Sequence, residues 1–146
     1  MLADAVGAPN FGLTLDVGHM LAAGENPTQG VAHAAARNFL FGIQLGDGHS
    51  RLGAEDGLMF GSVHRTMSME LIRQLYMSGY AGKLYFDTFP LNEDPIAEAE
   101  TNIATVTHFW RLSKGALGDE LATTTSTRDA VSLAQKLIKL EQGLYN

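Results

Sequence analysis

The sequence predicts an α/β fold with parallel strands, and two observations carry this prediction. Three short apolar runs alternate along the chain with segments whose apolar residues recur at helical spacing. A strand that follows a helical crossover pairs in parallel with the previous strand, and such crossovers are right-handed. An aspartate also comes within a few residues of the end of each run. Because the carboxyl ends of parallel strands face one side, chemistry is expected there.

Composition limits the class of protein. The chain has 146 residues, 45% of them hydrophobic, which is enough for a substantial core. A net charge of −6 argues against a nucleic-acid or anionic-membrane surface, since phosphates bind basic patches. There is no cysteine, and hence no disulfide or thiolate site. Without an apolar run of transmembrane length or a signal-peptide pattern, we expect a cytoplasmic protein.

The first two predicted strands flank a helix. Residues 11–15 form a short apolar run that is typical of a buried strand. Residues 28–39 carry small and apolar side chains three and four positions apart, which predicts a helix. Residues 40–45 form the second strand. Residues 46–61, rich in glycine and polar side chains, then predict a long loop, a kind of segment that is often functional.

The third predicted strand lies between two further helices. Residues 68–77 carry an apolar stripe that ends at Gly79. Residues 83–86 form the strand, and Asp94 with Pro95 predicts the capped start of the next helix. That helix carries apolar residues at helical intervals, namely Ile96, Ala99, Ile103, Val106 and Trp110.

The remaining chain divides by composition. Residues 1–114 hold the alternating strands and helices. Residues 115–127, rich in glycine and threonine, predict a flexible connector. Residues 128–146 predict an amphipathic C-terminal helix.

Candidate metal ligands gather where the predicted strands end. A single aspartate at a strand end often only caps the next turn, but three at the same position indicate a metal site. Oxygen and imidazole ligands suit Mn²⁺, Mg²⁺, Co²⁺ or Zn²⁺. The residues concerned are Asp16, Asp47 and Asp87, with His19, Gln44 and His49 nearby.

Five short motifs occur in order: LTLDVGH at residues 13–19, GENP at 24–27, GSVH at 61–64, GY at 79–80 and FDTFP at 86–90. Together they resemble the xylose isomerase-like TIM-barrel superfamily of sugar isomerases and epimerases, which also includes endonuclease IV-type enzymes. The resemblance extends over about residues 10–112. It implies a partial TIM (β/α)8 barrel in which residues 1–114 supply about three C-terminal βα units. A closed barrel takes about 250 residues. We therefore expect a fragment of a larger barrel, a homo-oligomer, or a partner chain that supplies the missing strands.

The resemblance also implies roles for the residues at the strand ends. Asp16 corresponds to the metal aspartate of the sixth barrel strand, and His19 to a histidine that contacts substrate and takes part in catalysis. Asp87 corresponds to the eighth-strand carboxylate, which is both a ligand and an acid or base. Gln44 replaces the usual seventh-strand histidine ligand. As a neutral amide it binds transition metals more weakly than imidazole, and Asp47 is a further expected ligand.

Residues of the long loop complete the expected site. His49, Arg51 and His64 are expected to bind substrate, while Glu55 and Asp56 are expected as auxiliary metal ligands.

The implied reaction is the isomerisation or epimerisation of a small sugar or sugar phosphate, in which carboxylates move a proton next to a carbonyl. Two alternatives stay open. A non-catalytic, truncated or accessory barrel subunit that packs against another chain is favoured by Gln44 and by the lack of an upstream glutamate. A phosphodiester-cleaving relative of endonuclease IV is less compatible with the net charge of −6.

Overall fold

A computed structural model describes residues 2–49, 52–53 and 55–141. The chain divides into two compact units, the first ending at Trp110 and the second beginning at Arg111. Each unit is described by itself.

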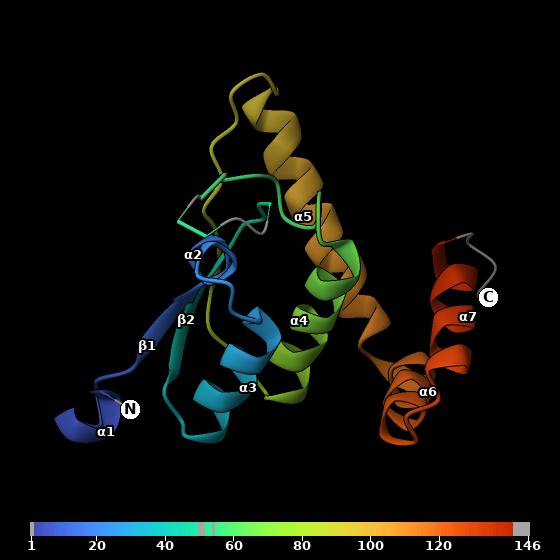
Figure 1. Ribbon diagram of the computed structural model, residues 1–146, viewed down its shortest axis with the longest axis horizontal. Helices are drawn as coiled ribbons and strands as arrows, with labels where there is room; N and C mark the ends of the chain where they lie inside the picture. Colours follow the sequence, from blue (N-terminus) through green and yellow to red (C-terminus); the bar gives the residue numbers. More distant parts are fainter. Residues whose placement is uncertain (1, 50–51, 54, 142–146) are drawn as a thin grey trace. The chain divides into compact units, whose positions relative to one another are not determined.

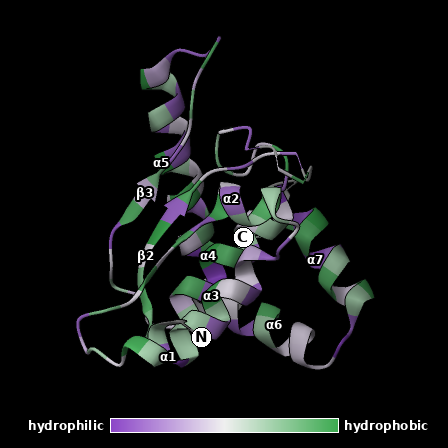
Figure 2. Ribbon diagram, turned by 60° about the vertical axis from the view of Figure 1, so that its left-hand side comes forward, coloured by the Kyte–Doolittle hydropathy of each residue, from purple (hydrophilic) through white to green (hydrophobic). Residues whose placement is uncertain are grey.

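The first unit is built on a parallel sheet. Its described strands are β1 (Leu13–Asp16), β2 (Leu40–Leu45) and β3 (Leu84–Phe86), in the order β1-β2-β3. Figure 1 shows β1 beside β2, and Figure 2 shows β3 beside β2. This confirms the predicted mixed α/β class with parallel strands. Three such strands are consistent with part of a TIM barrel, although the described residues do not close one.

Helices connect these strands. The described helices of the first unit are α1 (Leu2–Val6), α2 (Val17–Ala22), α3 (Pro27–Ala36), α4 (Arg65–Met77) and α5 (Pro95–Leu112), the last running into the second unit. The sequence pattern predicts neither α1 nor α2, because helices of five and six residues are too short for a helical period.

The two faces of the sheet differ in character. Side chains alternate along a strand, so Ile43 and Leu45 of β2 point to one face and are almost fully buried. Helix α3 packs against β1 and β2 on this apolar face and also contacts α4, as Figures 1 and 2 show. Val31 of α3 and Leu71 of α4 are fully buried in this layer. The other face carries the polar and small side chains.

Helix α5 buries a different stripe from the one that apolar spacing predicts. Its buried residues are Glu98, Asn102, Val106 and Phe109. Ile96 and Ile103 are instead 70% and 57% exposed. The predicted start of the helix is confirmed, because Oδ1 of Asp94 accepts hydrogen bonds from the backbone N–H groups of the first turn.

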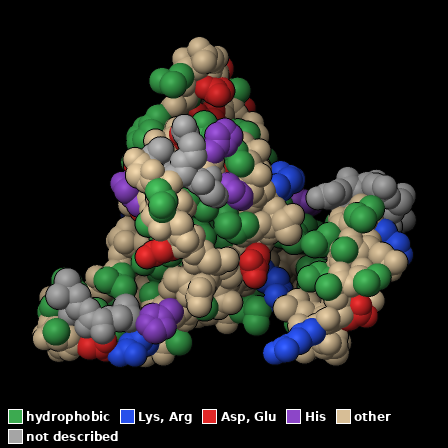
Figure 3. Space-filling view, viewed as in Figure 1, with side chains coloured by type: hydrophobic (Ala, Val, Ile, Leu, Met, Phe, Trp, Pro, Cys, Tyr) green, Lys and Arg blue, Asp and Glu red, His purple; other side chains and the backbone are tan. Residues whose placement is uncertain are grey.

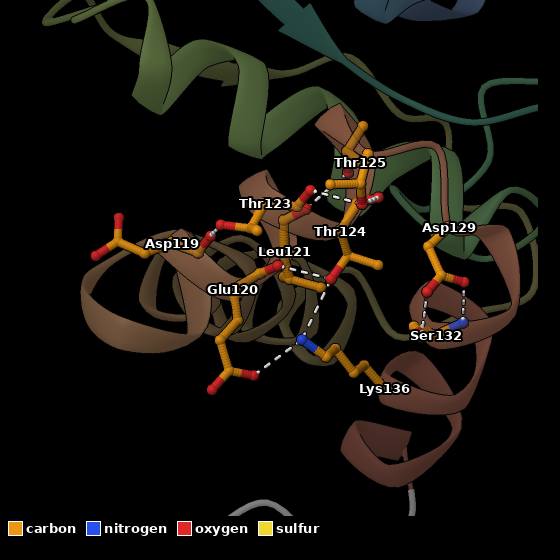
Figure 4. Close-up of polar contacts among 10 residues, drawn as sticks. Asp119, Glu120, Leu121, Thr123, Thr124, Thr125, Asp129, Ser132 and Lys136 are labelled. Atoms are coloured by element: carbon orange, nitrogen blue, oxygen red, sulfur yellow. Dashed lines mark hydrogen bonds and ion pairs between the residues drawn. The ribbon is translucent and has the colours of Figure 1, made fainter.

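The second unit corrects the flexible connector predicted for residues 115–127, because residues 115–126 form helix α6 (Gly115–Ser126). The hydroxyls of Thr123, Thr124 and Thr125 each donate to the carbonyl four residues earlier (Figure 4). Threonines bonded in this way sit within a helix rather than in a turn. Composition alone suggested the connector.

Helix α7 (Ala130–Glu141) lies within the segment where an amphipathic helix is predicted. Its coloured ribbon alternates between apolar and polar residues in Figure 2. The ammonium of Lys136 lies 3.1 Å from Oε2 of Glu120 and 3.2 Å from Oγ1 of Thr124, which ties α7 to α6 (Figure 4). Asp129 caps α7 by accepting the backbone N–H of Ser132.

Within the described ranges, no helix combines the length and the apolar character that a membrane crossing requires.

Candidate metal centre

The strand register brings the carboxyl ends of the strands together. Asp16 of β1 pairs with Gln44 of β2, and Gln44 pairs with Tyr85 of β3. Asp87 follows Tyr85 by two positions and therefore belongs to the same face. The side-chain amide of Gln44 donates from Nε2 to Oδ2 of Asp87 at 3.1 Å. The structure thus brings Asp16, Gln44 and Asp87 to one edge, as the sequence predicts.

A histidine lies between two carboxylates at this edge. Helix α2 begins directly after Asp16, so His19 comes back beside Asp16 after one turn. Nδ1 of His19 lies 2.9 Å from Oδ2 of Asp16, and its Nε2 lies 3.0 Å from Oε2 of Glu55. Oδ1 of Asp16 also accepts the backbone N–H of His19 and caps α2. We call Asp16, His19 and Glu55 the rim cluster.

The close approach of Glu55 requires a small residue on α2. A Cβ atom added to Gly18 would lie 3.1 Å from Oε1 of Glu55, closer than most such contacts. Gly18 is buried. Glycine at this position therefore leaves room for the carboxylate of the loop.

Negative charge dominates the surroundings of His19. The hydrogen bond that the His19 ring donates to Asp16 contributes most to raising the pKa of His19 above its ordinary value, followed by the charges of Asp16, Glu55 and Asp87. The side chain is 67% exposed, so solvent screens these interactions. The raised pKa favours an imidazolium, which places a positive charge between the acidic groups.

The donor set of the rim cluster fits a divalent cation. One ligand atom from each of its three residues can be chosen so that all lie within 4.8 Å of one another. Within the described part of the chain, the rim cluster is the group of histidine and acidic side chains whose ligand atoms lie this close together. Two carboxylates and an imidazole are ligands that Mn²⁺, Co²⁺ and Zn²⁺ accept, and Mg²⁺ prefers the oxygens. A cation bound here would replace the proton of His19.

Asp47 lies apart from this cluster. Its side chain is buried and accepts the backbone N–H groups of Gly48, Val63 and His64, each at 2.8 Å. Nδ1 of His64 is also 2.8 Å from Oδ1 of Asp47. The structure therefore gives Asp47 a role in holding the loop and does not bring it to the cluster as a ligand.

The other expected loop residues are spread out. His49 is exposed, and its backbone N–H donates to Oδ2 of Asp56 at 2.7 Å. His64 is partly buried beside Asp47. Arg51 lies outside the described residues. The structure does not gather these side chains into one described pocket.

Sequence reasoning underestimated Glu55 and missed Asn102. Glu55 was expected only as an auxiliary ligand, but it completes the rim cluster. Asn102 is 1% exposed, and its Oδ1 accepts the backbone N–H of Phe60 in the long loop. The sequence signal for this role is the spacing of Asn102. It lies four positions from both Glu98 and Val106, so the three residues share one face of the helix.

Charge is dispersed on the face drawn in Figure 3. The Lys and Arg side chains visible there are separated by neutral ones, and histidine and acidic side chains lie among hydrophobic groups.

Fold and site together define an α/β protein with a candidate metal centre at the carboxyl ends of parallel strands. No family model and no curated protein matches the sequence. Among solved structures, the chain is similar to a xylose isomerase domain protein from Alicyclobacillus acidocaldarius subsp. acidocaldarius, with a TM-score of 0.59 and 25% sequence identity. The match covers 77% of this chain and 42% of that one, so the chain spans less than half of its structural neighbour.

Proposed function

We propose that this chain is part of a divalent-metal-dependent sugar isomerase or epimerase. The observation that carries the proposal is the meeting of Asp16, His19 and Glu55 beside the Gln44–Asp87 pair, at the carboxyl ends of parallel strands. Active sites of parallel α/β folds are built at this edge. The similarity to a solved xylose isomerase domain protein supports the class of reaction.

The rim cluster would hold the metal. Asp16 and Glu55 supply carboxylate oxygens, and His19 supplies a ring nitrogen once its proton has left. A bound divalent cation would polarise a carbonyl and an adjacent hydroxyl of the sugar. Gln44 can add a neutral carbonyl oxygen, since its amide nitrogen is the atom that bonds Asp87.

Asp87 is the proposed acid and base. Gln44 binds Oδ2 of Asp87, which fixes the orientation of the carboxylate. In the proposed step, Oδ1 accepts the proton from the carbon next to the carbonyl, and the electron pair of the C–H bond forms an enediolate. Return of the proton to the neighbouring carbon, with the hydroxyl proton passing to the former carbonyl oxygen, gives isomerisation. Return to the other face of the same carbon gives epimerisation. The second face requires a group from outside the described residues.

The substrate contacts are also proposals. His64 has its ring oriented by Asp47, so it can present one fixed edge to a sugar hydroxyl. His49 is exposed on the same loop and Arg51 follows it in the sequence, which suits a small sugar or sugar phosphate.

A second candidate function is a non-catalytic accessory subunit of a barrel. Gln44 favours it, because a neutral amide stands where the resemblance implies an imidazole ligand. In this alternative, the residues of the rim cluster are present but the chain catalyses no reaction.

Deuterium exchange separates the two candidates. The full chain is incubated with Mn²⁺ in deuterated water and a panel of ketoses, aldoses and their phosphates, and the sugars are read by NMR. The proposal predicts deuterium at the carbon next to the carbonyl, lost in Asp87→Asn. If a chain that has bound Mn²⁺ exchanges none of the panel, the accessory function is the correct one.

A further inference from the structure

We infer that Asn102 of α5 is a positioning residue for the candidate metal centre, because it anchors the loop that carries Glu55. The inference rests on the proposed function in that Glu55 is taken as a metal ligand. It concerns a residue that lies outside the rim cluster and beyond the motifs of the sequence.

The burial of Asn102 is the first observation. The stripe that α5 buries includes Glu98 and Asn102, while Ile96 and Ile103 of the same helix are 70% and 57% exposed. Asn102 is only 1% exposed. Burying a side-chain amide costs free energy unless the amide is hydrogen-bonded, whereas burying an isoleucine would be favourable. The position therefore calls for a specific bonding partner.

That partner is the backbone of the loop. The N–H of Phe60 donates to Oδ1 of Asn102 at 2.9 Å, and Phe60 is itself 1% exposed. Nδ2 of Asn102 lies a longer 3.4 Å from Oε1 of Glu98. A buried backbone N–H without a partner is costly, so this bond fixes the loop at Phe60.

The Phe60 bond belongs to a series that fastens the loop next to Glu55. The carbonyl of Gly57 accepts the N–H of Phe89 at 2.7 Å. Leu58 exchanges two backbone hydrogen bonds with Asp47, both 2.9 Å long. Further along, the carboxylate of Asp47 holds the N–H groups of residues 63 and 64. Asn102 supplies the side-chain anchor from α5 in the middle of this series.

The consequence falls on Glu55, which lies three residues before Leu58. Its carboxylate must stay within ligand distance of His19, and a loop that shifts at Phe60 moves the segment that carries Glu55. Residues that orient metal ligands without touching the metal change affinity by about 10–100-fold when mutated. We therefore expect loss of the Asn102 anchor to weaken metal binding by about tenfold.

The test uses Mn²⁺ alone, with its Kd measured by electron paramagnetic resonance on the full chain. Asn102→Leu keeps the size and removes the acceptor. Asn102→Asp combined with Glu98→Gln keeps an acceptor oxygen for Phe60 without placing two carboxylates together, since the amide of Asn102 lies 3.4 Å from Glu98. Val106→Ala is the matched control, because Val106 is 8% exposed on the same stripe and its truncation removes apolar packing but no hydrogen-bonding side chain. Glu55→Gln marks the loss of a direct ligand. Hydrogen exchange of the Phe60 amide is followed in each variant.

We expect Asn102→Leu to raise the Kd about tenfold and to speed exchange at Phe60. The double variant with Asn102→Asp and Glu98→Gln should recover most of the affinity, and Val106→Ala should lower the Tm with an unchanged Kd. Equal Kd values for wild type and a folded Asn102→Leu overturn the inference, as does an equal loss in Val106→Ala. If the wild type binds no Mn²⁺, the proposed metal site fails. Unchanged exchange at Phe60 in Asn102→Leu would in addition refute the anchor itself.

Discussion

Nε2 of His19 and Oε2 of Glu55 lie 3.0 Å apart, although the two residues come from different connections of the sheet. His19 sits on the short helix after β1, and Glu55 sits in the long loop after β2. Since Asp16 holds the other ring nitrogen, the imidazole links the ends of two neighbouring strands. The pKa of His19 therefore responds to the charge of both carboxylates of the rim cluster.

The pKa of His19 should fall when either carboxylate is neutralised. Asp16 contributes most to the upward shift of this pKa and Glu55 contributes less, so Asp16→Asn should lower the pKa more than Glu55→Gln. NMR of the imidazole protons measures both shifts. Glu25→Gln, a change at an exposed acid outside the cluster, is the control and should leave the titration unchanged. Equal titration curves in all four proteins would contradict the described contacts.

Stability should depend on pH through the same residue. The pKa of His19 is raised in the folded state, so the stabilisation from its protonated form is fully present below the ordinary value of about 6.5 and is lost as pH rises through the raised pKa. The unfolding free energy of wild type relative to His19→Gln should therefore decline from pH 5.5 to pH 8. Urea unfolding at several pH values measures it. A relative stability that rises with pH over this window would refute the assigned sign.

Removal of the Asp47 carboxylate should destabilise the first unit strongly. Asp47→Ala removes the acceptor of the buried N–H of Gly48 and of the partly buried N–H groups of Val63 and His64. A buried donor without a partner costs about 1–3 kcal/mol and a partly buried one costs less, so we expect a loss of about 2 kcal/mol or more. Chemical denaturation measures the change. His64→Ala removes the imidazole beside Asp47 but keeps the backbone N–H that donates to it, so it should lower the free energy of unfolding less than Asp47→Ala does. A loss below about 1 kcal/mol in Asp47→Ala would show that the loop is held by other means.

An imidazole at position 44 should strengthen metal binding. Gln44 is paired in register with Asp16, so a histidine there would stand beside the rim cluster and offer a better ligand for Co²⁺ or Zn²⁺ than an amide. We expect Gln44→His to lower the Kd for Co²⁺ by about tenfold, read from the visible absorption of the bound ion. Gln44→Leu serves as the control for loss of the Asp87 bond. Weaker Co²⁺ binding in Gln44→His would place the site away from β2.

The exposed apolar side chains of the first unit should mediate association. In the described sheet, β1 and β3 are each paired on one side only, and an open hollow of about 420 Å³ is lined in part by Phe41, Gly42 and Tyr85. Phe41 and Tyr85 are 51% and 58% exposed. Unpaired strand edges and apolar surface favour association, so native mass spectrometry should show an oligomer, or a complex with a chain that adds strands.

The control for association is a charge placed on the apolar surface of α5. Ile103→Glu, at a side chain that is 57% exposed, should reduce the assembly if α5 takes part and leave it unchanged if the sheet alone does. A stable, well-folded monomer across micromolar concentrations would contradict the association.

The sequence predicts the backbone of the first unit better than the contacts of the site. The three strands, the Asp94 cap and the convergence of Asp16, Gln44 and Asp87 follow from local patterns and from the parallel register. The role of Glu55 does not, because its approach to His19 depends on how a long loop folds back. The loop-holding role of Asp47 likewise arises from its meeting with residues 63 and 64.

Helices were misjudged where side chains act against their usual preference. The threonines of α6 return their hydroxyls to the helix backbone, and composition cannot distinguish this from a connector. Helix α5 buries Val106, as apolar spacing predicts, but it also buries Asn102 and exposes Ile103, so apolar spacing alone assigns only part of the buried face. The hydrogen bond from Phe60 to Asn102 joins residues that are distant in the sequence, so no local pattern predicts it.

The central claim is that the rim cluster binds a divalent metal, and the metal content of the purified chain tests it most directly. Wild type and Asp16→Asn are loaded with Mn²⁺, Co²⁺ or Zn²⁺, desalted and measured by mass spectrometry, with Glu25→Gln as the control. We expect about one ion per chain in wild type and control, and at most about a tenth of that metal content in Asp16→Asn. Equal metal content in wild type and Asp16→Asn would contradict it.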